Sequence, residues 1–331
     1  MFVRSPKGFG TLPRSKVLRR EIDSMTVLET IQRSTDFLAR KGVESPRLQA
    51  ELLLAHVLRL PRMRLYLDFE RPLAPSELDT VRELVLRRSR REPLQHIVGT
   101  TSFCGLEIAV NRHVLVPRPE TELLAEAGWQ YLNPAAEARR DSPEPAAALD
   151  YGTGSGCLAV ALAAKCANAE IHALDISPEA LETAKLNAAK LGLADHIHFW
   201  LSNGFEGLPA GARFELILSN PPYIPSAEID TLEPEVREFD PRQALDGGVD
   251  GLDQYRRLAR EAGAFLHPGG RMMLEFGDGQ TEPLRALLEQ ENWIVERISD
   301  DYTGRPRIMI ARRNAGPVVE PNESPKPAGG V

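Results

Sequence analysis

Apolar residues follow two different periods along the chain, and the change of period marks two regions. Between residues 25 and 93 they recur three or four positions apart, as Leu28, Ile31 and Leu38 do, which is the spacing of one helix face. Further along, short apolar runs alternate with helical stretches. This pattern predicts a small helical domain followed by an α/β domain.

Helix boundaries are marked most clearly in the first region. At Ser45-Pro46 a hydroxyl that can cap a helix precedes a proline, which suits the first helical position. Ser76 is predicted to start a later helix, which ends in the basic run RRSRRE at residues 87–92. We interpret this run as a solvated face, and contact with an acidic or nucleic-acid-bound partner is the alternative.

The segment from residue 94 to residue 132 is predicted to be a β-rich connector. It contains a hairpin-like turn at Phe103-Cys104-Gly105-Leu106. Residues 133–145, NPAAEARRDSPEP, are rich in proline and polar residues, and they are predicted to form a loop.

Alternating strands and helices follow, so residues 133–313 are predicted to form a Rossmann-like domain. The predicted strands are AALD ending at Asp150, EIHALD ending at Asp175, HIHFWLS, FELILS and GGRMMLEFG, with two more candidates around Trp293 and in PRIMIAR. Helices are predicted from about Cys157 and from Pro178. Such alternation specifies a parallel sheet with helices on both faces, and ligands bind at the carboxyl ends of its strands.

Composition and charge narrow the possible functions. The net charge of -7 and the pI of about 5.6 lean against stable nucleic-acid binding. No stretch is long and apolar enough to span a membrane. The three cysteines, Cys104, Cys157 and Cys166, lack a metal-ligand spacing, which predicts a reduced, cytoplasmic protein without a metal site.

The two ends of the chain differ in composition from the rest. Residues 1–24 form a basic extension that we interpret as disordered, or as the product of an upstream start codon with Met25 as the natural beginning. A mitochondrial transit peptide is the alternative. Residues 314–331 are rich in Pro, Gly and Glu and are predicted to be a disordered tail.

The stretch LDYGTGSG at residues 149–156 is the first that suggests chemistry. An acid ends the strand, and glycines then alternate at Gly152, Gly154 and Gly156. Glycine lets the backbone turn sharply and lets a ligand press against it, and the following helix start offers N–H groups to a carboxylate. The spacing differs from G-x-G-x-x-G and resembles the D-x-G-x-G-x-G loop of S-adenosylmethionine-dependent methyltransferases.

Asp175 ends the second strand, about 25 residues after the first strand's acid. A carboxylate at this place can accept hydrogen bonds from both hydroxyls of a ribose, as in dinucleotide folds. The alternative is an ordinary acid that caps the turn after the strand.

The sequence Asn220-Pro221-Pro222-Tyr223 directly follows the fourth strand and resembles the catalytic motif of methyltransferases that act on a planar, conjugated nitrogen. The Asn220 oxygen and a neighbouring backbone carbonyl can each accept an N–H from a target NH2 group. The two prolines hold the backbone rigid and offer no N–H donor. Tyr223 supplies a flat face, so the motif predicts a clamp for an amide or an exocyclic amine.

A longer set of motifs makes the chain similar to the HemK-type protein-glutamine N5-methyltransferases, which modify peptide chain release factors. The resemblance covers roughly residues 25–313 and rests on PLQHIVG (93–99), VLVPRPETE (114–122), DYGTGSG (150–156), Asp175, SNPPYIP (219–225), EPEVREFDPRQALDGGVDGLDQYRR (233–257) and LEFG (274–277). It implies a class I methyltransferase domain that uses S-adenosylmethionine to methylate the Gln of a Gly-Gly-Gln loop in class I release factors.

The resemblance also assigns roles to residues of this chain. It implies that the cofactor's methionine part lies on Gly152, Thr153, Gly154, Ser155 and Gly156, its ribose on Asp175, and its remaining contacts on Asn203, Gly204 and Asn220. The Gln amide would lie on Asn220, Pro221, Pro222 and Tyr223, with the region of Arg118 and Glu120 lining the site. The N-terminal helices would dock the release factor.

Two departures from the family pattern concern the cofactor. Tyr151 stands where Leu is usual, and Asn203-Gly204 replaces an acid followed by a bulky residue near the adenine. The oxygen of Asn203 could still accept from the adenine amino group, but an apolar wall is lost at Gly204.

Other functions stay open from the sequence. One is an adenine-N6 methyltransferase acting on DNA or RNA, which would need a basic, target-reading region. Another is a glutamine methyltransferase acting on a ribosomal protein, and a third is a cofactor-binding module without catalysis.

Overall fold

This computed structural model describes residues 25–139 and 144–314. The basic extension predicted for residues 1–24 and the tail predicted from residue 314 therefore lie outside the described residues, except for Asn314. The chain divides into two compact units, residues 1–98 and 99–331.

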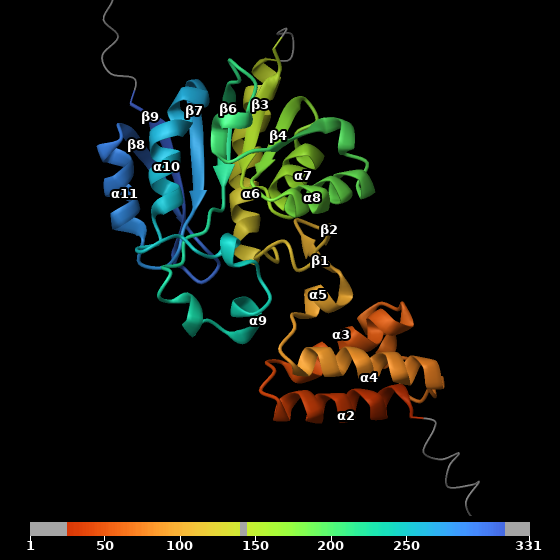
Figure 1. Ribbon diagram of the computed structural model, residues 1–331. Coiled ribbons are helices and arrows are strands. Elements are labelled where there is room, and N and C mark those ends of the chain that lie inside the picture. The colour runs from red at the N-terminus through yellow and green to blue at the C-terminus, as the bar shows by residue number, and fades with distance from the viewer. Residues whose placement is uncertain (1–24, 140–143, 315–331) are drawn as a thin grey trace, which may run out of the picture. The chain divides into compact units, whose positions relative to one another are not determined.

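The first unit is helical, as predicted (Figure 1). Its elements are α2 (Val27–Arg40), α3 (Pro46–Leu58), the 3-10 turn η1 (Arg62–Tyr66), α4 (Pro75–Ser89) and the short α5 (Leu94–Val98). The apolar stripes of these helices meet in one core, which includes Val27, Ile31, Leu38, Leu53, Leu54, Leu65, Val81 and Val85. This burial is the main source of the unit's stability, because isolated helices of this length are marginal in water.

The starts of the first two helices use different devices. Thr26 and Glu29 form a capping box on α2: the Glu29 N–H donates to the Thr26 hydroxyl at 3.3 Å, and the Thr26 N–H donates to the Glu29 carboxylate at 3.0 Å. Helix α3 begins at Pro46 as predicted, but the predicted cap by Ser45 is wrong. Ser45 has a φ of 45°, whereas a capping side chain requires an extended backbone at this position.

The basic run at residues 87–92 is not simply a solvated face. Arg87 forms an ion pair with Glu92. Arg88 is buried, and its guanidinium donates to the side chain of Gln49 and to the backbone carbonyl of Glu92. Part of the run therefore joins α4 to α3, so the prediction of a solvated face is wrong for Arg88.

The second unit begins with a hairpin. Strands β1 (Thr100–Phe103) and β2 (Leu106–Ala109) pair in antiparallel fashion with Phe103 opposite Leu106, which confirms the predicted turn. The rest of the predicted β-rich connector is wrong, because α5 and α6 (Pro119–Ala138) occupy much of it. Helix α6 also covers residues 133–138, where a loop was predicted.

A seven-stranded sheet forms the centre of the second unit, in the order β5-β4-β3-β6-β7-β9-β8 (Figure 1). The strands are β3 (Ala146–Tyr151), β4 (Ala169–Asp175), β5 (Ile197–Leu201), β6 (Phe214–Ser219), β7 (Leu266–Glu275), β8 (Trp293–Asp300) and β9 (Pro306–Arg313). The first five in spatial order are parallel, β9 pairs with β7 in antiparallel fashion, and β8 pairs with β9 in antiparallel fashion. The predicted α/β fold is confirmed, including the two late strands.

Helices cover both faces of this sheet (Figure 1). Helices α6, α7 (Cys157–Lys165) and α8 (Pro178–Lys190) share one core with the sheet, and α10 (Asp253–Glu261) and α11 (Thr281–Gln290) share the other. The shorter elements are η2 (Ala194–His196), η3 (Gly204–Gly207), η4 (Ile229–Thr231), α9 (Pro234–Arg237), η5 (Arg242–Ala244) and η6 (Ala262–Phe265).

Strand β3 lies between β4 and β6, so the strand order reverses at β3. In open α/β sheets such a switch point leaves a crevice at the carboxyl ends of the strands. The fold therefore places Asp150, Asp175 and the Asn-Pro-Pro-Tyr sequence at one edge of the sheet.

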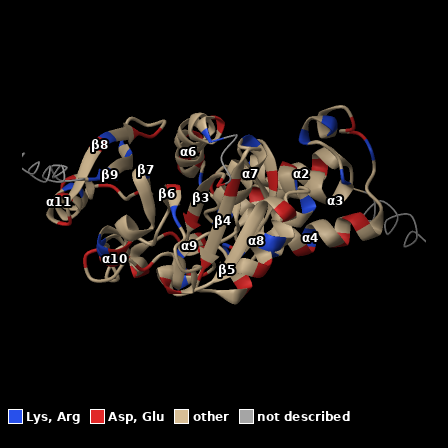
Figure 2. Cartoon of the chain, turned by 90° about the horizontal axis from the view of Figure 1, so that it is seen from above, with Lys and Arg blue, Asp and Glu red and all other residues tan. Residues whose placement is uncertain are grey.

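Charges of both signs are interspersed along the helices of the described chain (Figure 2). In the first unit many are paired: Arg47 and Arg62 with Glu51, and Arg71 with Glu77. None of the helices in the described ranges is long and apolar enough to cross a membrane.

Candidate active site

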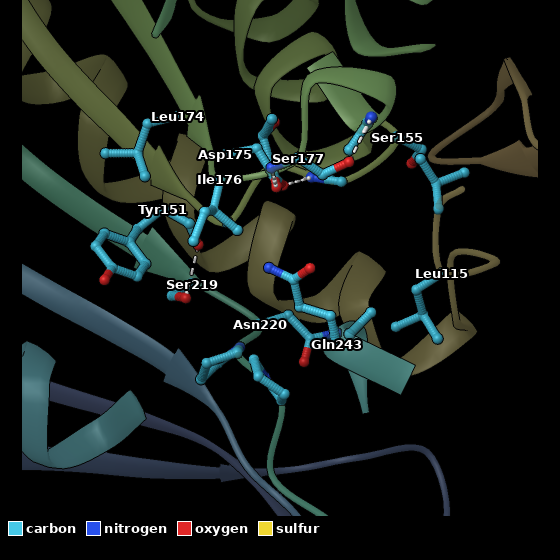
Figure 3. A pocket seen from close by; sticks show the side chains of 18 of the residues that line it. Leu115, Tyr151, Ser155, Leu174, Asp175, Ile176, Ser177, Ser219, Asn220 and Gln243 are labelled. Atoms are coloured by element: carbon cyan, nitrogen blue, oxygen red, sulfur yellow. Dashed lines mark hydrogen bonds between the residues drawn. The ribbon is translucent and has the colours of Figure 1, made fainter. Parts of the chain in front are cut away.

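A pocket opens at the carboxyl ends of β3, β4, β5 and β6 (Figure 3). The predicted site residues that line it are Gly152, Thr153, Gly154, Ser155, Asp175, Asn203, Gly204, Asn220, Pro221 and Pro222. The pocket also takes in residues that were not predicted to bind a ligand, including Leu115, Thr121, Ile176, Ser177, Gln243, Gln254 and Arg257. Of the predicted residues, Glu120, Gly156 and Tyr223 do not line it.

The glycine loop takes a backbone path that other residues rarely adopt. Gly152, Gly154 and Gly156 have φ values of 75°, 55° and 79°. A Cβ on either of the first two would meet no atom within 4 Å, whereas a Cβ on Gly156 would lie 2.9 Å from the Cβ of Ala184. The first two glycines therefore leave bare backbone beside the pocket, and the third allows α7 to pack closely on α8.

Asp150 holds the glycine loop from beneath. Its Oδ2 accepts from the Thr153 hydroxyl at 2.6 Å and from the Ala159 N–H at 3.1 Å, which ties the loop to the first turn of α7. The side chain is fully buried, and this burial raises the pKa of its carboxyl to about 7. Asp150 thus supports the loop and does not line the pocket.

Asp175 is fixed at the pocket by the backbone around it (Figure 3). Its Oδ2 accepts from the Gly154 N–H at 2.8 Å, and its Oδ1 accepts from the Ser177 N–H at 2.9 Å. Burial raises the pKa of this carboxyl, and the two backbone N–H groups act in the opposite direction. Each oxygen keeps a further lone pair, so the carboxylate can still accept from two ribose hydroxyls.

Arg257 occupies the part of the pocket next to Asn203 and Gly204. Its guanidinium donates to Asn203 Oδ1 at 2.6 Å and to the Asn203 backbone carbonyl at 2.7 Å. An ideal Cβ on Gly204 would lie 2.4 Å from the Arg257 guanidinium carbon. The space left by the missing side chain is thus filled by Arg257, and the Asn203 oxygen expected to face adenine already accepts a hydrogen bond.

The Asn-Pro-Pro turn presents acceptors to the pocket. The hydroxyl of Ser219 donates to the Tyr151 carbonyl at 2.7 Å, which anchors the turn to the neighbouring strand (Figure 3). The Asn220 Nδ2 donates to the Thr121 hydroxyl at 3.1 Å. With its donor end engaged, the carboxamide has its oxygen available for a ligand, and the prolines add carbonyls without competing N–H groups.

Tyr223 faces another part of the structure. Its ring packs against the core that includes α10 and α11, and a Cβ on Gly277 would lie 2.9 Å from it. The Tyr223 backbone carbonyl accepts from Gln280 Nε2 at 2.9 Å, and burial raises the pKa of the phenol to about 12. Contact between this ring and a substrate therefore stays a prediction.

Arg118 and Asp240 form an ion pair beside the pocket. Arg118 Nη2 lies 2.8 Å from Asp240 Oδ2, and the Asp240 side chain is almost fully buried. Burial raises the pKa of the Asp240 carboxyl to about 6, and the guanidinium opposes that rise. Arg118 was predicted to line the site, and the structure places it there.

One cluster elsewhere brings together residue types that can bind a metal: Glu170, His172 and His198. Trp200 Nε1 donates to His172 Nδ1 at 3.1 Å, so the neutral ring carries its proton on Nε2. Burial lowers the pKa of His172 to about 4, which keeps the ring neutral. The Nδ1 lone pair is thus used by Trp200 and Nε2 carries the proton, so His172 has no lone pair to offer and this donor set does not fit a metal.

Three of the pocket residues that sequence reasoning missed come from distant segments. Thr121 stands in PRPETE, and Gln243 and Arg257 stand in the long motif 233–257, so their motifs were noted but their side chains were not singled out. Nothing in the local pattern marks Arg257, because its role depends on the absence of a side chain more than 50 positions earlier.

The fold and the pocket together define a class of protein. A mainly parallel sheet with a glycine loop after one central strand and an acid after the next is the class I methyltransferase arrangement. Bare loop backbone, the nearby start of α7 and an acid with spare lone pairs fit S-adenosylmethionine, whose carboxylate and ribose need such partners.

Comparison with known proteins then identifies the family. Residues 29–99 match the PrmC N-terminal domain, and residues 138–233 match the methyltransferase small domain. The release factor glutamine methyltransferase of Geobacter sulfurreducens is 43% identical over 287 residues, which cover 87% of this chain and 96% of that protein. The protein of the same name from Rhodospirillum rubrum is 41% identical over a region that covers 87% of this chain and 85% of that protein. The chain belongs to the release factor glutamine methyltransferase family.

Proposed function

We propose that this protein transfers a methyl group from S-adenosylmethionine to the side-chain amide nitrogen of the Gln in the Gly-Gly-Gln loop of class I peptide chain release factors. The observation that carries the proposal is the Asn220 carboxamide, whose donor end is occupied while its acceptor end is available in the pocket. Membership of the family supports the choice of a Gln amide over an adenine amine.

The cofactor would lie across the ends of β3 and β4. Gly152 to Ser155 would hold its methionine part, with the carboxylate near the start of α7, and Asp175 would hold its ribose. When bound, S-adenosylmethionine supplies an electrophilic methyl group.

The residues of this chain would then act on the substrate amide. An amide nitrogen is a poor nucleophile because its lone pair is delocalised into the carbonyl. Asn220 Oδ1 and a carbonyl of the Asn-Pro-Pro turn would each accept one N–H of the Gln side chain, which fixes the nitrogen in place. The same dipoles oppose the positive charge that develops on nitrogen during attack. No strong general base is needed, because the proton can leave after methyl transfer.

We also propose that the helices of the first unit dock the release factor, and that the protein acts in the cytoplasm with its substrate. The family model for the N-terminal domain covers residues 29–99, which includes α3, α4 and α5. The interspersed charges of this unit suit a protein partner better than a nucleic-acid backbone (Figure 2).

Labelled S-adenosylmethionine tests the proposal. The purified protein would be incubated with a class I release factor and, in parallel, with a variant of that factor in which Gly-Gly-Gln is changed to Gly-Gly-Ala. Mass spectrometry should find one methyl group on the Gln of the unchanged factor and none on the variant. Labelling of a ribosomal protein or of DNA, with an unlabelled release factor, would overturn the proposed substrate and leave the methyltransferase class standing.

A further inference from the structure

The Asn220 carboxamide is useful to a substrate NH2 group only in one of its two orientations. A carboxamide carries an acceptor at one end and two donors at the other. With its oxygen toward the pocket, the Asn220 carboxamide can accept a hydrogen bond from a substrate NH2 group. After a flip of the side chain, the Asn220 NH2 group would face the substrate NH2 group, and neither could accept from the other. Something must therefore fix the direction of this side chain.

Thr121 makes the contact that can fix it. This residue lies in the first turn of α6 and is 2% exposed, and its hydroxyl oxygen accepts from Asn220 Nδ2 at 3.1 Å. A hydroxyl has a single proton, however, and could rotate to donate to the oxygen of a flipped carboxamide. The contact fixes Asn220 only if that proton is committed elsewhere.

Glu275 provides the place for the proton. It ends β7 and is 1% exposed, and its carboxyl group faces the Thr121 side chain. Its Oε2 is buried without any hydrogen-bond partner in the described structure. An ionised carboxylate can only accept hydrogen bonds. The Thr121 hydroxyl would therefore donate to an ionised Glu275, and its oxygen would remain an acceptor for Asn220.

We propose that Thr121 and Glu275 are positioning residues that orient the Asn220 carboxamide with its oxygen toward the substrate amide. The inference rests on the proposed function for its biological meaning. The three side chains follow one another from Glu275 at the end of β7, through Thr121 in the first turn of α6, to Asn220 after β6, and the Asn220 Nδ2 donates to the Thr121 hydroxyl at 3.1 Å.

The first test reads the orientation without any substrate. The side-chain amide protons of Asn220 can be identified in a proton–nitrogen NMR spectrum by their loss in Asn220→Ala. One of them should be shifted downfield and exchange slowly in the unchanged protein, and Thr121→Val should abolish both effects. An unshifted, rapidly exchanging pair in the unchanged protein would overturn the proposal, whatever the enzyme methylates.

The second test is a double-mutant cycle on methyl transfer. Thr121→Val keeps the shape of the side chain and removes its hydroxyl, so kcat should fall about 5- to 30-fold, as expected for one oriented hydrogen bond of about 1–2 kcal/mol. Thr121→Ser should restore most of kcat. In the Asn220→Ala background the same Thr121→Val change should cost less than about two-fold, because there is no carboxamide left to orient.

A matched control separates orientation from packing. Thr183 on α8 is also a buried threonine, 4% exposed, whose hydroxyl accepts from the Asn111 Nδ2 at 2.9 Å, and it does not line the pocket. Thr183→Val should leave kcat unchanged. An equal loss of kcat from Thr121→Val with and without Asn220 would overturn the proposal. Absence of release-factor methylation by the unchanged protein, with the downfield Asn220 signal present, would instead overturn the proposed function.

Discussion

Asn220 and Asp175 belong to one pocket but have separable tasks. The first stands at the end of β6 with its oxygen available, and the second is fixed at the end of β4 by two backbone N–H groups. If Asn220 acts on the substrate and Asp175 on the cofactor, single substitutions should affect different kinetic constants.

Asn220→Ala should lower kcat about 10²- to 10³-fold, the usual loss when one preorganised polar group is removed from a transition state. Its dissociation constant for S-adenosylhomocysteine should change less than about three-fold, because the ribose and methionine contacts remain. Asp175→Ala should show the reverse, with cofactor binding weakened at least about ten-fold, since charge-assisted hydrogen bonds are each worth about 1.5–3 kcal/mol. Calorimetric titration and initial rates measure both. Equal effects of the two variants on binding would contradict the assignment.

Gly204 is constrained twice, by its backbone and by its neighbour. Its φ is 75°, and the Arg257 guanidinium occupies the place of a side chain. Gly204→Ala should therefore displace Arg257 from Asn203 and weaken binding of S-adenosylhomocysteine by about ten-fold, which corresponds to about 1.4 kcal/mol. Calorimetric titration of the variant measures the change.

Gly279 offers a matched control for Gly204. It has a φ of 78°, and a Cβ there would meet no atom within 4 Å. Gly279→Ala should lose only the backbone term of about 1–2 kcal/mol in stability, with cofactor affinity unchanged. If both variants bind the cofactor as well as the unchanged protein, Arg257 does not form a wall of the site.

Helix α6 is the element that sequence reasoning missed, although it carries Thr121 to the pocket. Residues 133–145 were predicted to be a loop because Pro134 and its polar neighbours resemble one, but α6 continues to Ala138. Its buried residues, which include Leu124, Gly128 and Leu132, pack against the sheet. This packing stabilises the helix, so that it continues past Pro134. Long-range burial here overrides a local signal for a break.

The N-terminal end of α6 is joined to the long motif by the pair of Arg118 and Asp240. Arg118→Ala would leave the buried Asp240 carboxylate without its partner, so the free energy of unfolding should fall by about 1–2 kcal/mol at pH 8. This value is smaller than for a fully buried pair, because Arg118 is 37% exposed and solvent screens its charge. Without the guanidinium the Asp240 pKa should rise further above about 6. The folded variant then keeps a proton that the unfolded chain releases, so the loss should be smaller at pH 5.

Denaturant unfolding at both pH values measures this effect. The exposed pair of Arg82 and Asp79 on α4 provides a control, and Arg82→Ala should change stability by less than about 0.5 kcal/mol at either pH. A loss from Arg118→Ala that is equal at pH 5 and pH 8 would show that the ion pair is not its cause.

The parts of the site that could be predicted are those whose signal is local. Strand β6 has the bounds read from the sequence, Phe214–Ser219, because its buried apolar run ends abruptly at Asn-Pro-Pro. The glycine loop is equally local. Thr121, Arg257 and Glu275 could not be assigned roles, because each acts through a partner far away in the chain that only the folded sheet brings near.

Across the whole second unit, buried carboxyl groups gather near the carboxyl edge of the sheet. Burial raises the pKa of Asp150 and Glu275 to about 7 and that of Asp240 to about 6. Asp150 is hydrogen-bonded to the glycine loop, Asp240 is paired with Arg118, and Glu275 faces Thr121. Burying ionised groups destabilises a fold, so we infer that these carboxyls are retained for the geometry of the site.

The substitution Glu275→Gln tests whether a buried carboxyl destabilises the fold while it serves the geometry of the site, and the measurement is the pH dependence of stability. The carboxyl pKa is raised from 4.5 to about 7, chiefly by burial, while the nearby Thr121 hydroxyl and the charge of Arg307 act in the opposite direction. Between these two values the folded protein keeps a proton that the unfolded chain has lost. The free energy of unfolding contributed by Glu275 therefore falls as pH rises from about 4.5 to 7, by about 3 kcal/mol, and is constant above that range.

The Gln variant lacks this titration, so its stability relative to the unchanged protein should improve steadily from pH 5 to pH 7.5. Arg118, Glu120, Tyr223 and Tyr255 also face Glu275 but are present in both proteins, so the difference isolates the carboxyl. Glu282→Gln, on an exposed side chain of α11, should show no such trend. At pH 8 kcat should nevertheless fall in Glu275→Gln, because an amide can donate to Thr121 and release Asn220 to flip. If Glu275→Gln gains relative stability and keeps full kcat, the Glu275 carboxylate is not needed to orient Asn220.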